Sequence, residues 1–103
     1  MISLLFYAYL VSTPLLPMIA PADYPPQAVR MGWQGDVGVD LVISKRGRVI
    51  HCTVYQSSGH EVLDDATCEI FVKRARFKPA IDADGNPIEE KYHASPVKWR
   101  LGS

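Results

Sequence analysis

Apolar and polar residues alternate along the segment that follows Gly35, and this alternation organises the rest of the chain. Every second residue from 37 to 43 is apolar, which is the period of a β-strand with one buried face. The polar segment 44–47 ends in glycine, as a short hairpin loop requires. The alternation then resumes, which predicts an antiparallel partner strand. The predicted inward residues are Val37, Val39, Leu41 and Ile43 on the first strand and Ile50, Cys52 and Val54 on the second.

A helix is predicted over residues 63–76, because this segment contains no glycine or proline and is rich in helix-forming residues. Leu63, Ala66 and Ile70 share one stripe of this helix, whereas the pattern leaves Phe71 unassigned. Acidic residues occupy the first turn and basic residues the last, an order that complements the helix dipole. The basic end therefore needs no ligand to explain it. The charged residues are Asp64 and Asp65 at the start and Lys73, Arg74 and Arg76 at the end.

The chain after this helix predicts a turn and one long final strand. Residues 82–87 combine Asp, Gly, Asn and Pro, which are typical of turns. Residues 90–101 form the predicted strand, and Pro96, which has no amide hydrogen, favours a sheet edge for it. Alternation predicts that Val97, Trp99 and Leu101 face one side, with Trp99 in the core, and that Lys98 and Arg100 face the other.

A short helix is predicted in front of the first strand, over residues 24–32. Pro26 suits its first position, where no amide hydrogen is needed, and Gly32 suits a left-handed end. This helix would pack the start of the domain against the sheet.

The chain carries an ordered series of short motifs: Tyr24-Pro25, Gly35-x-Val37, Gly47-Arg48-Val49, Ser57-Ser58-Gly59, Leu63-Asp64-x-Ala66, Arg76-Phe77-x-Pro79-Ala80, Gly85-x-Pro87 and Val97-x-Trp99-x-Leu101. In this order and spacing they resemble the C-terminal domain of the TonB energy-transducer family over about residues 23–101. The resemblance implies a two-layer α+β fold. One main helix would pack across a small three-stranded antiparallel sheet, with a short helix on the N-terminal side.

The resemblance also implies a function, which is non-enzymatic and needs no cofactor. The domain would lie in the periplasm and bind the N-terminal segment, or TonB box, of TonB-dependent outer-membrane receptors. This binding would be linked to energy-dependent transmembrane transport, with an inner-membrane energising complex as a further partner. The alternative is a stand-alone structural or interaction domain of the cell envelope.

The family places the receptor segment beside the terminal strand, and hairpin order independently leaves that strand one free side. An extended peptide satisfies the unpaired backbone groups of such an edge by β-augmentation. A second copy of the chain could pair there instead and form a homodimer. The predicted peptide-binding residues are Ser95, Val97, Lys98, Trp99, Arg100 and Leu101 on the strand, with Tyr24 and Gln27 near the receiving site.

Cys52 and Cys68 resemble a cysteine-pair branch of the family. Two cysteines in an exported chain favour one disulfide between them. Two buried free thiols are the alternative. No Cys-x-x-Cys motif is present, which argues against a redox enzyme.

The segment 1–22 contains no charged residue and reads as a leader in front of a domain at 23–103. Its apolar run and the small residues Ala20 and Ala22 predict an export signal that is cleaved after Ala22. An uncleaved anchor is disfavoured because Pro14 and Pro17 interrupt the run, and a mis-assigned start is a further alternative. A full transducer of the family also has a long Pro-rich spacer, which does not occur between Ala22 and Tyr24. Within the family, that spacer lets one chain sit in the inner membrane and also reach the outer membrane.

Composition and spacing argue against other classes of function. The 11 Lys and Arg residues balance 11 Asp and Glu residues, so the chain lacks the basic excess of a nucleic-acid binder. His51 and Cys52 are adjacent on a predicted strand and point to opposite faces, which argues against a shared zinc ion. The turn at residues 82–87 lacks the spacing of a calcium loop. No nucleophile elbow surrounds Ser57 or Ser58, so we expect no catalytic site.

Overall fold

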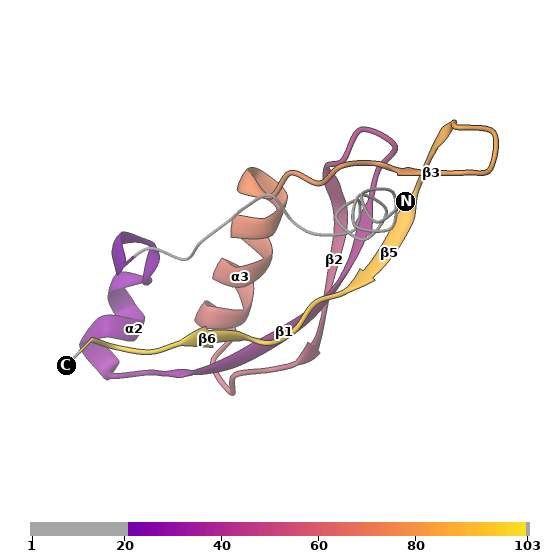
Figure 1. Cartoon of the computed structure of the whole chain (residues 1–103). Coiled ribbons are helices and arrows are strands. Elements are labelled where there is room, and N and C mark those ends of the chain that lie inside the picture. The colour runs from indigo at the N-terminus through magenta and orange to yellow at the C-terminus, as the bar shows by residue number, and fades with distance from the viewer. Residues whose placement is uncertain (1–20, 103) are drawn as a thin grey trace.

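Strand β1, Gly35–Ile43, lies at the centre of the sheet in the computed structural model, which describes residues 21–102. Strand β2, Val49–Gln56, pairs antiparallel with one side of β1. Strands β5, Glu90–His93, and β6, Val97–Trp99, pair antiparallel with successive parts of its other side. The sheet is thus three strands wide, with an interrupted third strand (Figure 1).

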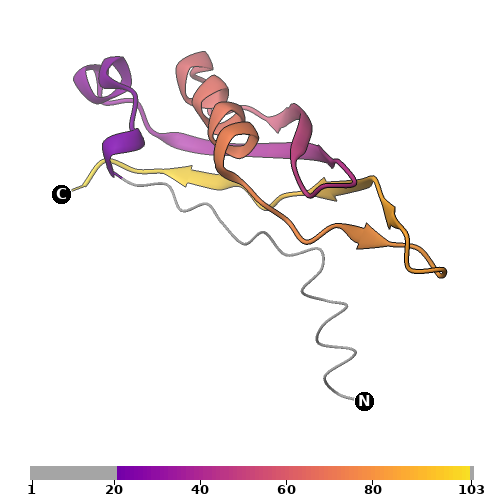
Figure 2. The same cartoon turned by 90° about the horizontal axis from the view of Figure 1, so that it is seen from above.

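Helix α3, Glu61–Arg74, is the main helix and packs across β2 and β1. The shorter helix α2, Pro26–Met31, lies on the same side of the sheet (Figure 2). The predicted two-layer α+β fold is confirmed. Pro26 occupies the first turn of α2, and Gly32 ends it with a left-handed φ of 70°, as its sequence indicates.

Three further small elements complete the described chain. The 3-10 turn η1, Pro21–Asp23, precedes α2. Strands β3, Ala80–Ile81, and β4, Pro87–Ile88, form a two-stranded hairpin that projects from one end of the sheet (Figure 1). The predicted turn connects them, and the Asp82 carboxylate accepts hydrogen bonds of 2.9 Å from the amides of Asp84 and Asn86.

The core lies between the sheet and the helices. All four apolar residues predicted to face inward on β1 are buried, as is expected of a strand covered on one face. Helix α3 buries Leu63 and Ile70 of its apolar stripe, whereas Ala66 is only partly buried, and it buries Phe71 and Thr67 as well. The buried residues of α3 are Leu63, Thr67, Ile70 and Phe71.

The predicted inward position of Ile50 is wrong. Ile43 pairs with Val49 and Val42 with His51, so Ile50 is an additional residue in a β-bulge. The bulge turns Val49 into the core with 4% exposure and leaves Ile50 46% exposed.

The predicted limits of the main helix are also shifted. The helix begins at Glu61 rather than residue 63 and ends at Arg74 rather than residue 76. Ala75 has an extended backbone, with φ −68° and ψ 135°, so the helix cannot continue through it. Arg76 instead forms a β-bridge with Arg48.

A disulfide joins Cys52 on β2 to Cys68 on α3, with their Cα atoms 5.7 Å apart. It closes a loop with a sequence separation of 16, which contains the turn between the two elements. Such a cross-link removes conformational freedom mainly from the unfolded chain, so it stabilises the packing of α3 on the sheet.

The turn before α3 is held by the carboxylate of Asp64. It accepts hydrogen bonds from the hydroxyl groups of Ser57 at 2.5 Å and Ser58 at 2.8 Å, and from the Ser58 amide at 3.0 Å. Burial alone would raise the pKa of Asp64, but these hydrogen bonds and nearby His60 outweigh it and lower the pKa. The serines therefore have a structural role at the start of the helix.

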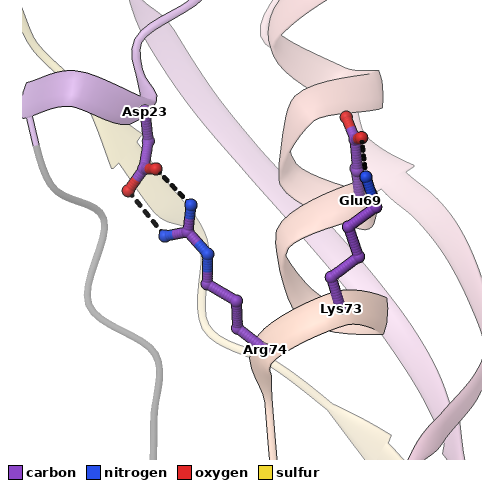
Figure 3. Close-up of polar contacts among 4 residues, drawn as sticks. All are labelled: Asp23, Glu69, Lys73 and Arg74. Carbon is purple, nitrogen blue, oxygen red and sulfur yellow. Dashed lines mark hydrogen bonds and ion pairs between the residues drawn. The ribbon is translucent and has the colours of Figure 1, made fainter.

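The other end of α3 holds the N-terminal part of the domain. Arg74 forms a two-pronged ion pair with Asp23, in which one hydrogen bond measures 2.8 Å, and Lys73 pairs with Glu69 one turn earlier (Figure 3).

Residues 1–20 of the predicted leader lie outside the described residues. Within residues 21–102, no helix has the length and apolar character needed to cross a membrane.

Candidate functional site: the open edge formed by β5 and β6

Strands β5 and β6 form an outer edge of the sheet. Both pair with β1, and no other strand of the described chain pairs with their outer side. Strand β2 is the outer strand on the opposite side. An edge of this kind presents backbone donors and acceptors that an extended peptide can satisfy.

The predicted continuous strand over residues 90–101 is wrong, because the edge changes register in its middle. Asp40 pairs with His93, and Val37 pairs with Val97. Between these pairs, the two β1 residues at 38–39 oppose the three residues at 94–96. The additional residue is a bulge that ends β5 and lets β6 start in a new register.

Trp99 lies behind the edge, in the core, as its alternation with Val97 predicts. Its side chain is 1% exposed, and its indole nitrogen donates a 2.8 Å hydrogen bond to the Thr67 hydroxyl on α3. That hydroxyl in turn donates to the Leu63 carbonyl at 2.8 Å. Trp99 can therefore offer a peptide its backbone, while its side chain fixes β6 to the helix.

Tyr24 also supports the edge from behind. Its ring meets the Trp99 ring edge-on, with centroids 5.2 Å apart, and its hydroxyl donates to the Trp33 carbonyl at 2.5 Å. Burial raises the pKa of the Tyr24 hydroxyl, and the charge of Arg100 offsets part of this effect. Gln27 is exposed on α2, and no hydrogen bond among residues 21–102 connects it to β6.

The two cations of the terminal segment differ in their surroundings. Arg100 forms a 2.8 Å ion pair with Asp36 on β1 and donates to the Gly35 carbonyl at 3.3 Å. Lys98 is exposed and takes part in no ion pair within the described chain. Lys98 is thus the cation that can meet an acidic group on an added strand.

The remaining predicted residues mark the two ends of β6. Ser95 is exposed in the bulge, and Val97 is half-buried at the first position of the strand. The Leu101 amide donates to the Gln34 side chain at 2.7 Å. That bond closes the strand, so the usable edge lies before Leu101.

One cluster beside the edge was missed by sequence reasoning. The Tyr55 hydroxyl on β2 donates to the Ala94 carbonyl at 2.6 Å, and the Tyr55 ring stacks on His93 with centroids 4.2 Å apart. The His93 ring nitrogen Nδ1 lies 2.5 Å from the Asp40 carboxylate. The one signal in the sequence was Gly38, since a glycine inside a strand often marks the close approach of another group.

The surroundings of the β5–β6 edge favour strand pairing over other chemistry. Two members of the cluster, Asp40 and His93, line a hollow on the sheet together with Thr53 and Lys91. Among residues 21–102, no three His, Cys, Asp or Glu side chains converge in a way that could hold a metal ion. Backbone hydrogen bonding at the edge is the chemistry that the geometry offers.

The chain is similar to known proteins over most of its length. Residues 20–101 match the family model described as Gram-negative bacterial TonB protein C-terminal. Protein tonB2 of Pseudomonas aeruginosa is 34% identical over 79 residues, which cover 77% of this chain and 28% of that relative. Protein TonB of Vibrio cholerae is 32% identical over 78 residues, which cover 76% of this chain and 31% of that relative. The chain thus matches less than a third of the length of either relative.

Proposed function

Because the chain belongs to the family of C-terminal domains of Gram-negative bacterial TonB proteins, we propose that it binds the N-terminal segment of a TonB-dependent outer-membrane receptor. The segment adds to the sheet as a strand beside β6. Binding takes place in the periplasm and contributes to energy-coupled transport, with an inner-membrane complex as the energising partner. The proposed role is non-enzymatic.

The open edge of β6 is the observation that carries this proposal. Its outer side has no strand partner among the described residues, and its inner side is held by pairing with β1. The bond between Trp99 and Thr67 also ties it to α3. A rigid edge needs little ordering when a peptide binds, which lowers the entropic cost of association.

Main-chain bonding also predicts the character of the interaction. Backbone groups are the same in every peptide, so we expect modest affinity and loose sequence specificity. Exposed Lys98 adds a preference for peptides with an acidic residue beside the paired segment. This electrostatic part should weaken as the salt concentration rises.

The same edge supports a second use, because a second copy of the chain can pair with it and form a dimer. A dimer through β6 would compete with the peptide for one set of backbone groups. An envelope domain that binds no receptor segment is the remaining alternative. A sedimentation measurement with and without peptide distinguishes these states, since peptide should convert any such dimer to monomers.

Titration of a labelled receptor peptide against proline variants tests the proposal. Adjacent residues of a strand direct their amides to opposite sides, so one of Val97→Pro and Lys98→Pro removes an outward donor and the other an inward donor. The outward variant should weaken peptide binding at least ten-fold with a small loss of stability, whereas the inward variant should mainly harm the fold. Lys98→Ala is the matched control that keeps the amide. Unchanged binding in both folded proline variants would contradict the proposal.

A further inference from the structure

We propose that Tyr55 is a positioning residue for the peptide-binding edge, although it lies on the opposite outer strand. It reaches across β1 and holds Ala94, and this contact sets the point at which β6 begins to pair with an added strand. The inference rests on the function proposed above for β6. We use the name "latch" for the contact between Tyr55 and Ala94.

The latch lies where both neighbours of β1 change register. On one side, Gly38 pairs with Gln56 and Val39 with Val54, so Tyr55 is an additional residue in β2. On the other side, the same two β1 residues oppose the bulge at residues 94–96. The two irregularities therefore face each other across β1, and the Tyr55 side chain connects them.

Gly38 provides the space for this crossing. A Cβ atom placed on Gly38 would lie 2.4 Å from the Cζ atom of Tyr55, which is far inside van der Waals contact. Any side chain at residue 38 would therefore displace the Tyr55 ring. The ring also stacks on His93, whose nitrogen contacts Asp40, and these neighbours keep it directed toward Ala94.

Both backbone polar groups of Ala94 form hydrogen bonds within the domain. The Ala94 amide donates to the Val39 carbonyl at 3.0 Å, and the Ala94 carbonyl accepts the Tyr55 hydroxyl. The Ala94 side chain is also buried, with 4% exposure. Pro96, two residues later, has no amide hydrogen to offer. Ala94 and Pro96 thus offer no amide to an added strand, and regular pairing with β1 resumes at Val97, the first residue of β6.

A stable starting point matters because a one-residue slip turns every side chain of a strand to the other face. If the bulge could move along the edge, Val97 and Trp99 would exchange their inward positions with Lys98. With Ala94 held, β6 keeps one register against β1 and presents the same donors to every peptide. Tyr55 acts through Ala94 and need not touch the peptide.

Tyr55→Phe is the direct test, because it removes the hydroxyl and keeps the ring over Gly38. Tyr92→Phe is the matched control, since Tyr92 lies on β5 and its hydroxyl forms no hydrogen bond within residues 21–102. We expect amide exchange at Ala94, whose amide donates to the Val39 carbonyl, to become about three- to ten-fold faster in the free Tyr55→Phe protein, as loss of one hydrogen bond implies. The Tyr92→Phe protein should exchange at the wild-type rate.

Peptide affinity separates positioning from general stability. We expect Tyr55→Phe to weaken peptide binding about three- to ten-fold at a temperature far below melting. Val49→Ala lowers stability at the distant end of β2 and should leave affinity unchanged. Equal affinity for Tyr55→Phe and wild type, or unchanged exchange at Ala94, would overturn the proposal. If wild type binds no peptide, the proposed function fails, while the exchange measurement still decides whether Tyr55 holds the bulge.

Discussion

The indole nitrogen of Trp99 donates a hydrogen bond of 2.8 Å to the hydroxyl of Thr67, and both side chains are buried. This bond joins the terminal strand to the main helix, which are 32 residues apart in sequence. It explains why a threonine lies on the buried face of α3, since the indole donor would otherwise have no partner in the core.

Replacing Thr67 by valine should therefore destabilise the domain. Valine has a similar shape but leaves the indole donor of Trp99 unsatisfied, at a cost of about 1–3 kcal/mol in the free energy of unfolding. Thr67→Ser keeps the hydroxyl and should cost less. Urea unfolding followed by Trp fluorescence measures both values, and equal stabilities for the two variants would contradict this role.

Removal of the disulfide should lower stability without changing the fold. A closed loop of this length contributes about 3 kcal/mol, so Cys68→Ala should lower the melting temperature markedly. Cys52 should then react with a thiol reagent once the variant unfolds. Dithiothreitol should shift the melting temperature of wild type but not of a variant with both Cys52→Ala and Cys68→Ala. Two titratable thiols in denatured, unreduced wild type would contradict the bond.

Gly38 and Tyr55 should be energetically coupled. Gly38→Ala forces the Tyr55 ring away and breaks its bond to Ala94, so we expect a loss of about 1–3 kcal/mol in the free energy of unfolding. The same substitution in a Tyr55→Ala background should cost much less, because the space is then free. A double-mutant cycle measures the coupling. Strict additivity would show that the two residues do not interact.

Asp64 should make stability depend on pH in the acid range. Its pKa in the folded protein is lowered, so the ionised carboxylate stabilises the fold above its unfolded pKa of about 3.9. This contribution is lost as the pH falls through the lower, folded pKa. The stability difference between wild type and Asp64→Asn should accordingly be largest near pH 7 and should shrink toward pH 2. A difference that grows on acidification would show that the pKa is raised instead.

The sequence pattern was sufficient to predict those elements in which a residue's position along the chain determines whether it is buried. Strand β1 has a strict period of two, so its inward residues follow directly from alternation. Trp99 is predicted in the same way from its spacing with Val97. Gly32 and Pro26 mark the ends of α2 because the backbone conformations they favour are needed there.

Other features depend on how distant segments meet, and periodicity along one strand does not contain that information. The Ile50 bulge depends on the pairing of β2 with β1, and the interruption at residues 94–96 depends on a pairing more than 50 residues away in sequence. The latch requires the bulge at Tyr55 in β2 and the bulge at residues 94–96 to lie opposite the same two residues of β1. Within the site, alternation placed Lys98 and Arg100 together, but only the structure separates Arg100, which pairs with Asp36, from Lys98.

Hydrogen–deuterium exchange of backbone amides, measured by NMR with and without a receptor N-terminal peptide, tests the central proposal most directly. Bound peptide should slow exchange at the outward-facing amides of residues 97–100 and leave the amides of β2 unchanged, because only one edge gains a strand. Exchange in β5 and α3 should change little. Unchanged exchange at residues 95–101, together with protection on another surface, would show that the receptor segment does not bind beside β6.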